Sequence, residues 1–355
     1  MRYFNKKASI AIFTTGYWRS YFFQKLFSNC AKMSLYNYKK ESIYPKNVKA
    51  DYILWEKQLP FCPYDHFDEN KVFIFDYEDG GDRDKLIEAA IKWKIKRPRF
   101  LLLFPKKEHD DTGCLPLPPP AKLQKQYFFS PKKLRDRKHD TFFMCAPTYI
   151  HISKSELQNK KDLPYFTKIE ERKEYFYNQR LEWVEKLKYG GLLRIGNGII
   201  RSNHDYLKED IILKQFKFKK DIFVPPISKK TFTHNLLNSK IVFSPGGHSR
   251  WAYRHVESMF NRALTISADI SDRKSLPKLP HDAFLMIPDG KFNVKKIQSI
   301  LDSIESFQEK AEIGFEFAKS TYKERTFLHR ERFRKNKVKE MFNNLTNWLE
   351  ANLQR

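Results

Sequence analysis

Residues 239–267 read SKIVFSPGGHSRWAYRHVESMFNRALTIS, and this stretch decides the fold. The apolar run 241–244 predicts a buried strand, and the turn Pro245-Gly246-Gly247 ends it. A helical pattern over 250–260 then leads to a second apolar run at 264–267. Parallel strands need such a crossover between them, because the chain has to return to the end of the sheet at which the first strand began. The stretch therefore predicts one strand–helix–strand repeat of a parallel sheet.

The same alternation of apolar runs and helical patterns extends through both halves of the chain. Buried strands are expected at residues 9–13, 51–55, 72–76, 100–104, 141–145, 192–195 and 284–287. Helices are expected over residues 18–27, 84–94, 179–187 and 294–322, and a last helix carries apolar residues from Val338 to Leu349. Strands that alternate with helices favour parallel sheets. We therefore expect an α/β protein with two Rossmann-like domains facing a cleft, and with C-terminal helices.

The length of 355 residues suggests two domains at roughly 150 residues each. Residues 105–138 break the alternation, because a proline-rich run at 115–120 precedes a basic stretch at 122–138. The expected order is a first domain over 1–110, a linker over 111–138, a second domain over 139–322, and a C-terminal helix over 323–355 that could pack back on the first domain. Ligands of parallel sheets bind beyond the carboxyl ends of the strands, so we expect the site in the cleft between the domains.

The composition is strongly basic: 67 Lys and Arg against 42 Asp and Glu give a formal charge of +25. Such a charge suits nucleic acid, an anionic membrane surface or anionic small molecules. Aromatic residues make up 15% of the chain, which excludes wholesale disorder. The four cysteines form no CxxC pair, which argues against a zinc site or a disulfide framework. No apolar run approaches the ~20 residues that span a bilayer. We expect a cytoplasmic protein, either free or at the cytoplasmic face of the membrane.

The glycine turn after the strand at 241–244 carries the chemistry. Gly246 and Gly247 let a ligand approach the backbone, since neither has a Cβ. Ser249 is expected to cap the following helix, whose free N–H groups and dipole suit an anion. His248 lies inside this loop and could touch a diphosphate or a leaving group. The plain alternative is a structural glycine turn.

Arg254 and Glu257 lie three residues apart on the helix after this turn, and therefore share one face. An arginine can grip a phosphate, and a glutamate can accept hydrogen bonds from two sugar hydroxyls. Together with the glycine turn, the pair predicts a site for a nucleotide sugar. The alternative is an ion pair on the helix surface without a ligand.

The order strand–SPGG–S–x4–R–x2–E–x5–A–L–T–I resembles the donor-binding half of GT-B glycosyltransferases and is most similar to the exostosin-like family. The resemblance covers about residues 139–325, and the matching positions are Ser239, Lys240, Pro245, Gly247, Arg254, Glu257, Ala263, Leu264, Thr265, Ile266, Leu279, Pro280 and Phe284. The chain departs from the family where Asn261-Arg262-Ala263 replaces a glycine and where Thr265 replaces a proline.

The resemblance implies an enzyme that moves a sugar from a UDP- or GDP-linked donor to a glycan or glycolipid acceptor. The expected settings are the synthesis of surface polysaccharide, lipopolysaccharide or glycoprotein glycan. It also implies an inverting reaction without a metal or another cofactor, because helix N–H groups and Arg254 would neutralise the leaving diphosphate.

The base for such a reaction is expected from the acidic segment after the strand at 72–76. Residues 63–88 hold nine acids and three bases, against the trend of the chain. A carboxylate at the end of a strand could act as general base, and Asp76 and Asp79 are the candidates. Asp82 and Asp84 also spell DxD, a pattern of metal sites, but the preferred interpretation is that Asp84 begins a helix.

Several further residues are weaker candidates, each with a plain turn or packing role as its alternative. Thr15, Gly16, Tyr17 and Arg19 could contact the acceptor, Asn197, Gly198 and Arg201 could line the donor pocket, and Asp289-Gly290 could reach the nucleotide. Arg180 supports the resemblance by its position, and His255 lies buried in the expected helix.

The rival hypothesis is a basic protein that binds nucleic acid or another surface without catalysis. Lys and Arg cluster at residues 122–138 and 323–339, which also suits an anionic membrane surface. The chain has no helix-turn-helix, zinc-finger or RNP pattern, so we expect no nucleic-acid partner.

Overall fold

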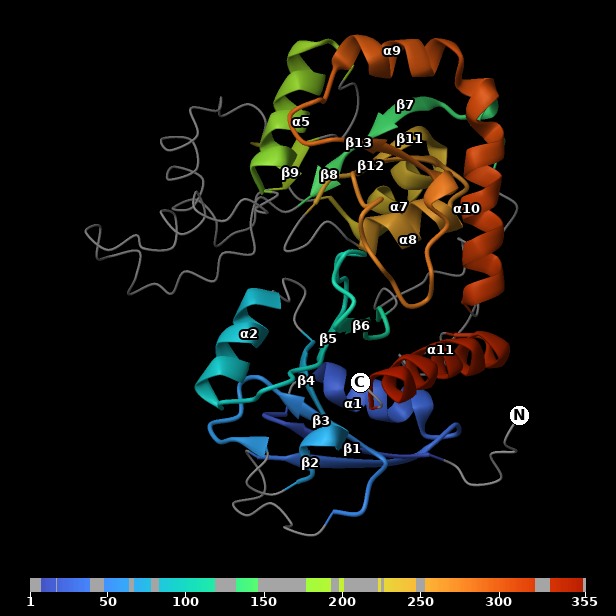
Figure 1. Ribbon diagram of the computed structural model, residues 1–355. Helices are drawn as coiled ribbons and strands as arrows, with labels where there is room; N and C mark the ends of the chain where they lie inside the picture. Colours follow the sequence, from blue (N-terminus) through green and yellow to red (C-terminus); the bar gives the residue numbers. More distant parts are fainter. Residues whose placement is uncertain are drawn as a thin grey trace, which may run out of the picture. The chain divides into compact units, whose positions relative to one another are not determined.

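The computed structural model describes residues 8–16, 18–38, 48–63, 67–77, 83–118, 132–145, 177–192, 198–200, 223–224, 227–246, 253–322 and 333–353. The chain divides into two compact units (Figure 1). Unit 1 comprises Met1–Lys122, Asp272–Leu279 and Ser320–Arg355, and unit 2 comprises Leu123–Ser271 and Pro280–Lys319. Each unit is built on a parallel sheet, as the alternating sequence pattern predicts.

Unit 1 contains a six-stranded sheet in the order β2-β1-β3-β4-β5-β6, and every neighbouring pair is parallel. The strands are β1 (Ser9–Thr14), β2 (Lys32–Asn37), β3 (Tyr52–Glu56), β4 (Val72–Asp76), β5 (Phe100–Leu102) and β6 (Thr112–Cys114). The chain moves from β1 to β2 on one side and then to β3 on the other. The strand order therefore reverses between β1 and β3, the place where open α/β sheets usually bind ligands.

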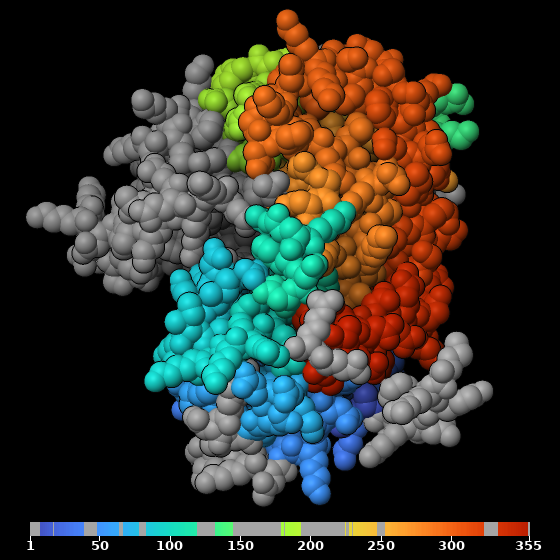
Figure 2. Space-filling model, in the orientation of Figure 1, coloured from blue at the N-terminus to red at the C-terminus, as the bar shows by residue number. Residues whose placement is uncertain are grey.

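Helices cover both faces of this sheet. The α-helices described in unit 1 are α1 (Trp18–Phe27), α2 (Arg83–Lys92) and α11 (Lys335–Leu353). On one face, Leu86 of α2 packs in a buried cluster with inward residues of β1, β3 and β4. On the other, the ring centroids of Phe27 and Phe342 are 5.3 Å apart, and those of Phe73 and Trp348 5.7 Å. Figure 2 shows the red atoms of α11 against blue atoms of the N-terminal part of the chain.

The boundaries of unit 1 differ from the expected first domain. A linker was expected from residue 111, but Thr112–Cys114 forms β6, and a Cβ on Gly113 would lie 2.6 Å from the Trp348 ring. Only a glycine at position 113 allows α11 to approach this strand so closely. The stretch is therefore packed as part of the sheet and is not a linker. The segment Asp272–Leu279 also belongs to unit 1, since Lys274 N–H donates to Pro105 O at 2.8 Å.

Unit 2 contains a four-stranded parallel sheet in the order β13-β12-β11-β7. Its strands are β7 (His139–Phe142), β11 (Ser239–Ser244), β12 (Leu264–Ala268) and β13 (Phe284–Ile287). A separate three-stranded parallel sheet contains β8 (Met144–Cys145), β9 (Gly198–Ile200) and β10 (Phe223–Val224). The single strand expected at 141–145 therefore divides at Phe143 between two sheets. Of the strand expected at 192–195, Leu192 lies in no strand and 193–195 are outside the described residues; the next strand described is β9, from Gly198.

The helices described in unit 2 are α5 (Tyr177–Tyr189), α7 (Lys229–Asn238), α8 (Tyr253–Phe260), α9 (Val294–Asp302) and α10 (Gln308–Thr321), the last up to Lys319. The helix expected over 294–322 is broken by a short 3-10 turn at Ile304–Phe307. Ser303 and Ser306 explain the break, because their hydroxyls bond the carbonyls of Ser299 and Ser303 at 2.8 Å each. Among the described helices of the chain, none is long and apolar enough to cross a membrane.

Candidate functional site

The backbone at the end of β11 is fixed by the first turn of α5. The N–H of Gly246 donates to Gln179 Oε1 at 3.0 Å, and its carbonyl accepts from Arg180 Nε at 2.7 Å. Gln179 and Arg180 are 8% and 9% exposed. Both polar groups of Gly246 are therefore satisfied inside the protein, which sets the direction in which the glycine loop leaves the strand. The sequence indicated Arg180 only as part of a resemblance and gave no sign of Gln179.

The rest of the predicted donor loop lies outside the described residues. This applies to Gly247, His248 and Ser249, whose roles stay predictions. The helix expected from residue 250 is described from Tyr253, at the start of α8. The predicted Arg254–Glu257 pair lies on this helix, in its first two turns.

Arg254 is held between two aromatic rings. Its guanidinium carbon lies 4.5 Å from the ring centroid of Phe232 and 5.4 Å from that of Phe142. Its Nη2 donates to Met144 O at 2.9 Å, and its Nη1 lies 3.3 Å from Glu257 Oε2. The side chains of Arg254 and Glu257 are 16% and 22% exposed. Arg254 and Glu257 share one face and form an ion pair, the arrangement that the alternative describes, and their role in binding a nucleotide sugar stays a prediction. The rings fix the orientation of a partly exposed cation near the ends of β7 and β8.

A buried polar network lies under this edge of the sheet. The His255 ring is fully buried, with Nδ1 at 2.8 Å from Ser244 Oγ and Nε2 at 2.6 Å from Ser267 Oγ. Ser258 Oγ lies 2.6 Å from Thr265 Oγ1. Ser267 Oγ donates to Ala268 O at 2.7 Å, so it accepts from the N–H at His255 Nε2, and Nδ1 faces the hydroxyl of Ser244. His255 thus joins α8 to the ends of β11 and β12, as a structural residue rather than a ligand contact.

The carboxyl edge of the unit 1 sheet contains a carboxylate that sequence reasoning missed. Glu56, at the end of β3, is 2% exposed. It accepts from the hydroxyls of Thr14 and Thr15 at 2.8 and 2.9 Å, and from the Thr15 N–H. Gly16 follows with a φ of +95°, and a Cβ there would lie 2.7 Å from the Asn37 amide. The β1–α1 loop is therefore tightly fixed at the point where the strand order reverses.

Asp76, the predicted base, is fully buried at the end of β4 and forms an ion pair with Lys57. The Lys57 side chain is 10% exposed and is the more accessible partner. A general base has to come within hydrogen-bond reach of the proton that it removes, and in this structure Lys57 holds the Asp76 carboxylate. Asp79 lies outside the described residues.

The remaining weaker candidates either make contacts within the protein or lie outside the described residues. Arg19 is 3% exposed and donates to Tyr77 O at 2.8 Å, so it braces the interior of unit 1 and offers no acceptor contact. Its neighbour Trp18 is instead 41% exposed. Asp289 accepts from Gln179 Nε2 at 3.5 Å, and Gly290 has a φ of +70°, as a turn requires. Outside the described residues lie Tyr17, Asn197, Arg201 and Asp82.

No protein-family model and no curated protein matches this chain. Solved structures of glycosyltransferases are similar to it at low identity. One from Rickettsia africae shows 10% identity and a TM-score of 0.46, covering 97% of this chain and 99% of its own. Sucrose-phosphate synthase from Thermosynechococcus elongatus shows 9% identity and a TM-score of 0.45, with the same coverages.

A third similar structure is S. aureus TarM in complex with Fondaparinux, alpha-GlcNAc-glycerol and UDP. It shows 11% identity and a TM-score of 0.32 over 85% of this chain, which spans about half (52%) of the TarM chain. Because these likenesses have TM-scores below 0.5, we assign neither family nor activity from them. These structures do not confirm the resemblance to the exostosin-like family.

Proposed function

We propose that this protein is a GT-B glycosyltransferase that moves a sugar from a nucleotide-linked donor to a glycan acceptor. The observation that carries the proposal is the fixed backbone of Gly246 at the carboxyl end of β11. A strand that ends at a glycine with a fixed backbone, and that a helix follows in the sequence, is a suitable arrangement for a diphosphate, since ligands of parallel sheets bind at the carboxyl ends of the strands. The helix that follows also presents Arg254 and Glu257.

In this proposal the donor occupies the carboxyl edge of the unit 2 sheet. Gly247 and Ser249 hold the diphosphate through backbone N–H groups, and His248 lies beside it. Gly246, also predicted to bind the diphosphate, instead fixes the start of the loop, because its own N–H is bonded to Gln179. Arg254 stabilises the charge that develops on the leaving diphosphate, so no metal is required. The rings of Phe142 and Phe232 support this role because they hold the guanidinium in place, and a diphosphate would compete with Glu257 for it. Glu257 accepts from a sugar or ribose hydroxyl.

The acceptor is proposed to bind unit 1, and the base for an inverting transfer comes from the segment after β4. Asp76 can act only if an acceptor hydroxyl takes the place of Lys57, since Lys57 holds its carboxylate in the present structure. Asp79, three residues further on, is the alternative base. The fixed loop Thr15–Gly16 supports an acceptor site here, because it borders the reversal of strand order.

The proposed donor is UDP- or GDP-linked, and the proposed acceptor is a glycan or a glycolipid of a surface polysaccharide, lipopolysaccharide or glycoprotein pathway. The formal charge of +25 supports contact with an anionic membrane face in the cytoplasm. Each Lys or Arg near an anionic leaflet adds about 1 kcal/mol to binding.

A thermal-shift titration with UDP, GDP and CMP tests the proposal. A nucleotide at about 100 times its Kd stabilises the folded chain by about 2.7 kcal/mol, which raises Tm by roughly 5–10 °C for a domain of this size. We expect this shift with one nucleotide, and we expect Arg254→Ala to remove it. Arg135→Ala is the matched control, since Arg135 is an arginine of unit 2 that is 56% exposed.

Two results would count against a glycosyltransferase. The first is the absence of a shift with all three nucleotides. The second is tight, salt-sensitive binding of an oligonucleotide by the same preparation, which would favour the nucleic-acid hypothesis.

A further inference from the structure

Unit 1 has a cavity of about 590 Å³ at the amino-terminal edge of its sheet. Its walls come from the residues just before β4, β5 and β6 and from the last turn of α11. Ligand pockets usually have volumes of about 300–1,000 Å³. All strands of a parallel sheet run from their amino ends to their carboxyl ends in the same direction. The cavity lies at the amino ends, so it is separate from the candidate site at the carboxyl ends.

Two sides of the cavity are rigid. Arg99 donates from Nη1 to Asn352 O and from Nη2 to Glu69 O, both at 2.7 Å, and stacks 4.8 Å from the ring centroid of Phe73. Asp111 accepts from Arg83 Nε at 3.1 Å and from Thr112 Oγ1 at 2.9 Å. These two planar groups keep their positions without a ligand, so binding would cost little ordering of the walls.

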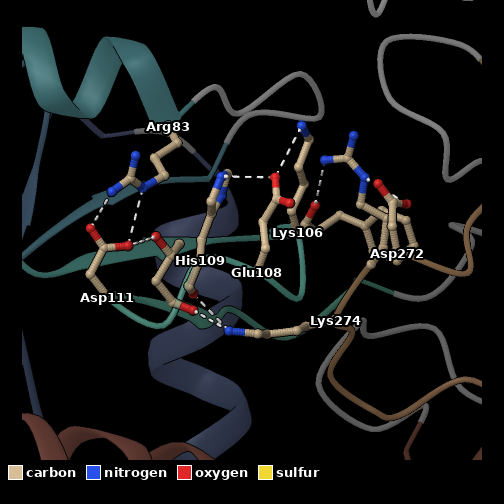
Figure 3. A network of polar contacts seen from close by, with 10 residues as sticks. Arg83, Lys106, Glu108, His109, Asp111, Asp272 and Lys274 are labelled. Carbon is tan, nitrogen blue, oxygen red and sulfur yellow. Dashed lines mark hydrogen bonds and ion pairs between the residues drawn. The ribbon is translucent and has the colours of Figure 1, made fainter.

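The loop that carries Asp110 and Asp111 is also anchored (Figure 3). Lys274 Nζ donates to His109 O at 2.7 Å and to Thr112 O at 3.3 Å, on either side of the two acids. Lys274 belongs to the segment Asp272–Leu279, which the sequence pattern assigned to the second domain. The anchoring by a distant segment indicates that this wall is fixed by the fold.

The charges around the cavity balance. Lys96, Arg97 and Arg99 oppose Glu69, Asp110 and Asp111, a formal sum of zero in a chain of +25. The lining residues alone therefore give a polyanion no net attraction, and Arg83, bonded to Asp111, adds one positive charge next to them. Among the described lining residues only Pro98 has an apolar side chain, and the carbon atoms of the long polar side chains supply the rest of the apolar surface. The carboxylates and amide oxygens of the lining accept hydrogen bonds, and its cationic groups and amide nitrogens donate them. Hydroxyl groups on neighbouring carbons of a sugar can do both, so such a lining suits them.

We infer that this cavity binds a neutral glycan segment, as a site without catalysis at the opposite edge of the sheet from the candidate chemistry. Arg99 and Asp111 form the fixed floor and wall. The exposed side chains of Asn70, Lys96 and Asp110 complete the contacts with sugar hydroxyls. The inference does not depend on transfer activity, because binding can be measured without a donor.

Saturation-transfer NMR on the full chain tests the site. The neutral probes are maltoheptaose, chitohexaose and mannohexaose, and the anionic probes are a heparin hexasaccharide and inorganic phosphate. We expect saturation transfer to a neutral probe. Asn70→Ala and Asp110→Ala should each weaken its binding about fivefold, the effect of losing one hydrogen bond. Both residues are exposed, so these variants should fold.

The matched control is Glu88→Ala, since Glu88 is an exposed carboxylate of α2 outside the cavity lining. It should leave the binding of the neutral probe unchanged. Three results would overturn the inference: no saturation transfer to any neutral probe at about 10 mM, where a Kd near 1 mM would be detected; binding of a neutral probe that neither cavity variant changes; or binding confined to the anionic probes. Failure of nucleotide binding would leave this result intact, so the two proposals fail separately.

Discussion

At the carboxyl ends of their strands, the two parallel sheets carry different side chains. This end of each sheet is called its carboxyl edge. In unit 1, the edge contains buried carboxylates: Glu56 is satisfied by threonine donors, and Asp76 by Lys57. In unit 2, the interior of the edge is neutral, with His255 between two serines, and the charged pair Arg254–Glu257 is partly exposed. Similar topology thus supports a negative edge and an edge with an accessible cation. Under the proposed function, the two units would therefore take different parts in the transfer.

The largest effect is expected where unit 1 buries a charge pair. Asp76→Ala leaves the ammonium of Lys57 without its partner in a site where that side chain is 10% exposed. Breaking a buried pair in this way costs about 3–5 kcal/mol of the free energy of unfolding. Urea denaturation measures the loss. Asp84→Ala, which removes an exposed acid of α2, should cost below about 1 kcal/mol. Equal losses in the two variants would show that the pair does not support the fold.

The neutral network of unit 2 should be nearly as sensitive. His255→Ala removes a fully buried ring and leaves the hydroxyls of Ser244 and Ser267 without that partner. A buried cavity with unsatisfied polar groups costs about 3 kcal/mol. His234→Ala is the control, since His234 is exposed on α7, and it should change the free energy of unfolding by less than about 0.5 kcal/mol. A stable His255→Ala protein would contradict the structural role of the ring.

A smaller effect is expected from Glu56→Gln at the unit 1 edge. The amide keeps one oxygen acceptor but loses the charge that receives three hydrogen bonds from Thr14 and Thr15. The expected loss is about 1–2 kcal/mol in thermal unfolding, since hydrogen bonds to charged groups contribute more than neutral ones. An unchanged Tm would mean that the charge of Glu56 adds nothing to the stability of the loop.

The smallest effect is expected on the free energy of unfolding at acidic pH, to which both units should contribute in the same direction. Burial lowers the pKa of His109 in unit 1, helped by Arg83, and burial also lowers the pKa of His139 in unit 2, helped by His234. Each histidine then binds its proton more readily in the unfolded chain. The free energy of unfolding therefore falls as the pH drops through about 6.5 towards the folded pKa.

Variants of the two histidines separate these contributions. His109→Gln and His139→Gln should each reduce the loss of stability between about pH 7.5 and pH 5, by less than about 1 kcal/mol because both rings are partly exposed. Chemical denaturation at the two pH values measures it. A steeper dependence on pH in either variant would contradict the direction of the shift.

The fold could be predicted where its signals are local. The stretch from β11 to β12 has apolar runs and a glycine turn, and the bounds of both strands lie within two residues of those expected. The missed elements carry weaker patterns. Strand β2 (Lys32–Asn37) is mostly half-buried and polar, and α7 (Lys229–Asn238) is indicated by little beyond its cap at Ser228, which accepts from Thr231 N–H at 3.1 Å. Tertiary packing stabilises such elements more than local sequence does.

The candidate site could be predicted only in part, because its supporting partners are distant in sequence. Gln179 lies 67 residues before Gly246, and Thr14 lies 42 residues before Glu56. A motif shows Gly246, Arg254 and Glu257, which are close together on one strand–turn–helix unit. It does not show which side chain from another element satisfies the glycine backbone, since that depends on the three-dimensional fold.

Isothermal titration of UDP and GDP into three forms of the chain tests the central claim most directly. The claim is that the edge of unit 2, and not that of unit 1, holds the nucleotide. We predict that the natural chain binds one of the nucleotides, that Gln179→Ala weakens binding about tenfold by releasing the Gly246 backbone, and that Glu56→Gln leaves it unchanged. Binding that Glu56→Gln abolishes and Gln179→Ala leaves intact would contradict the account.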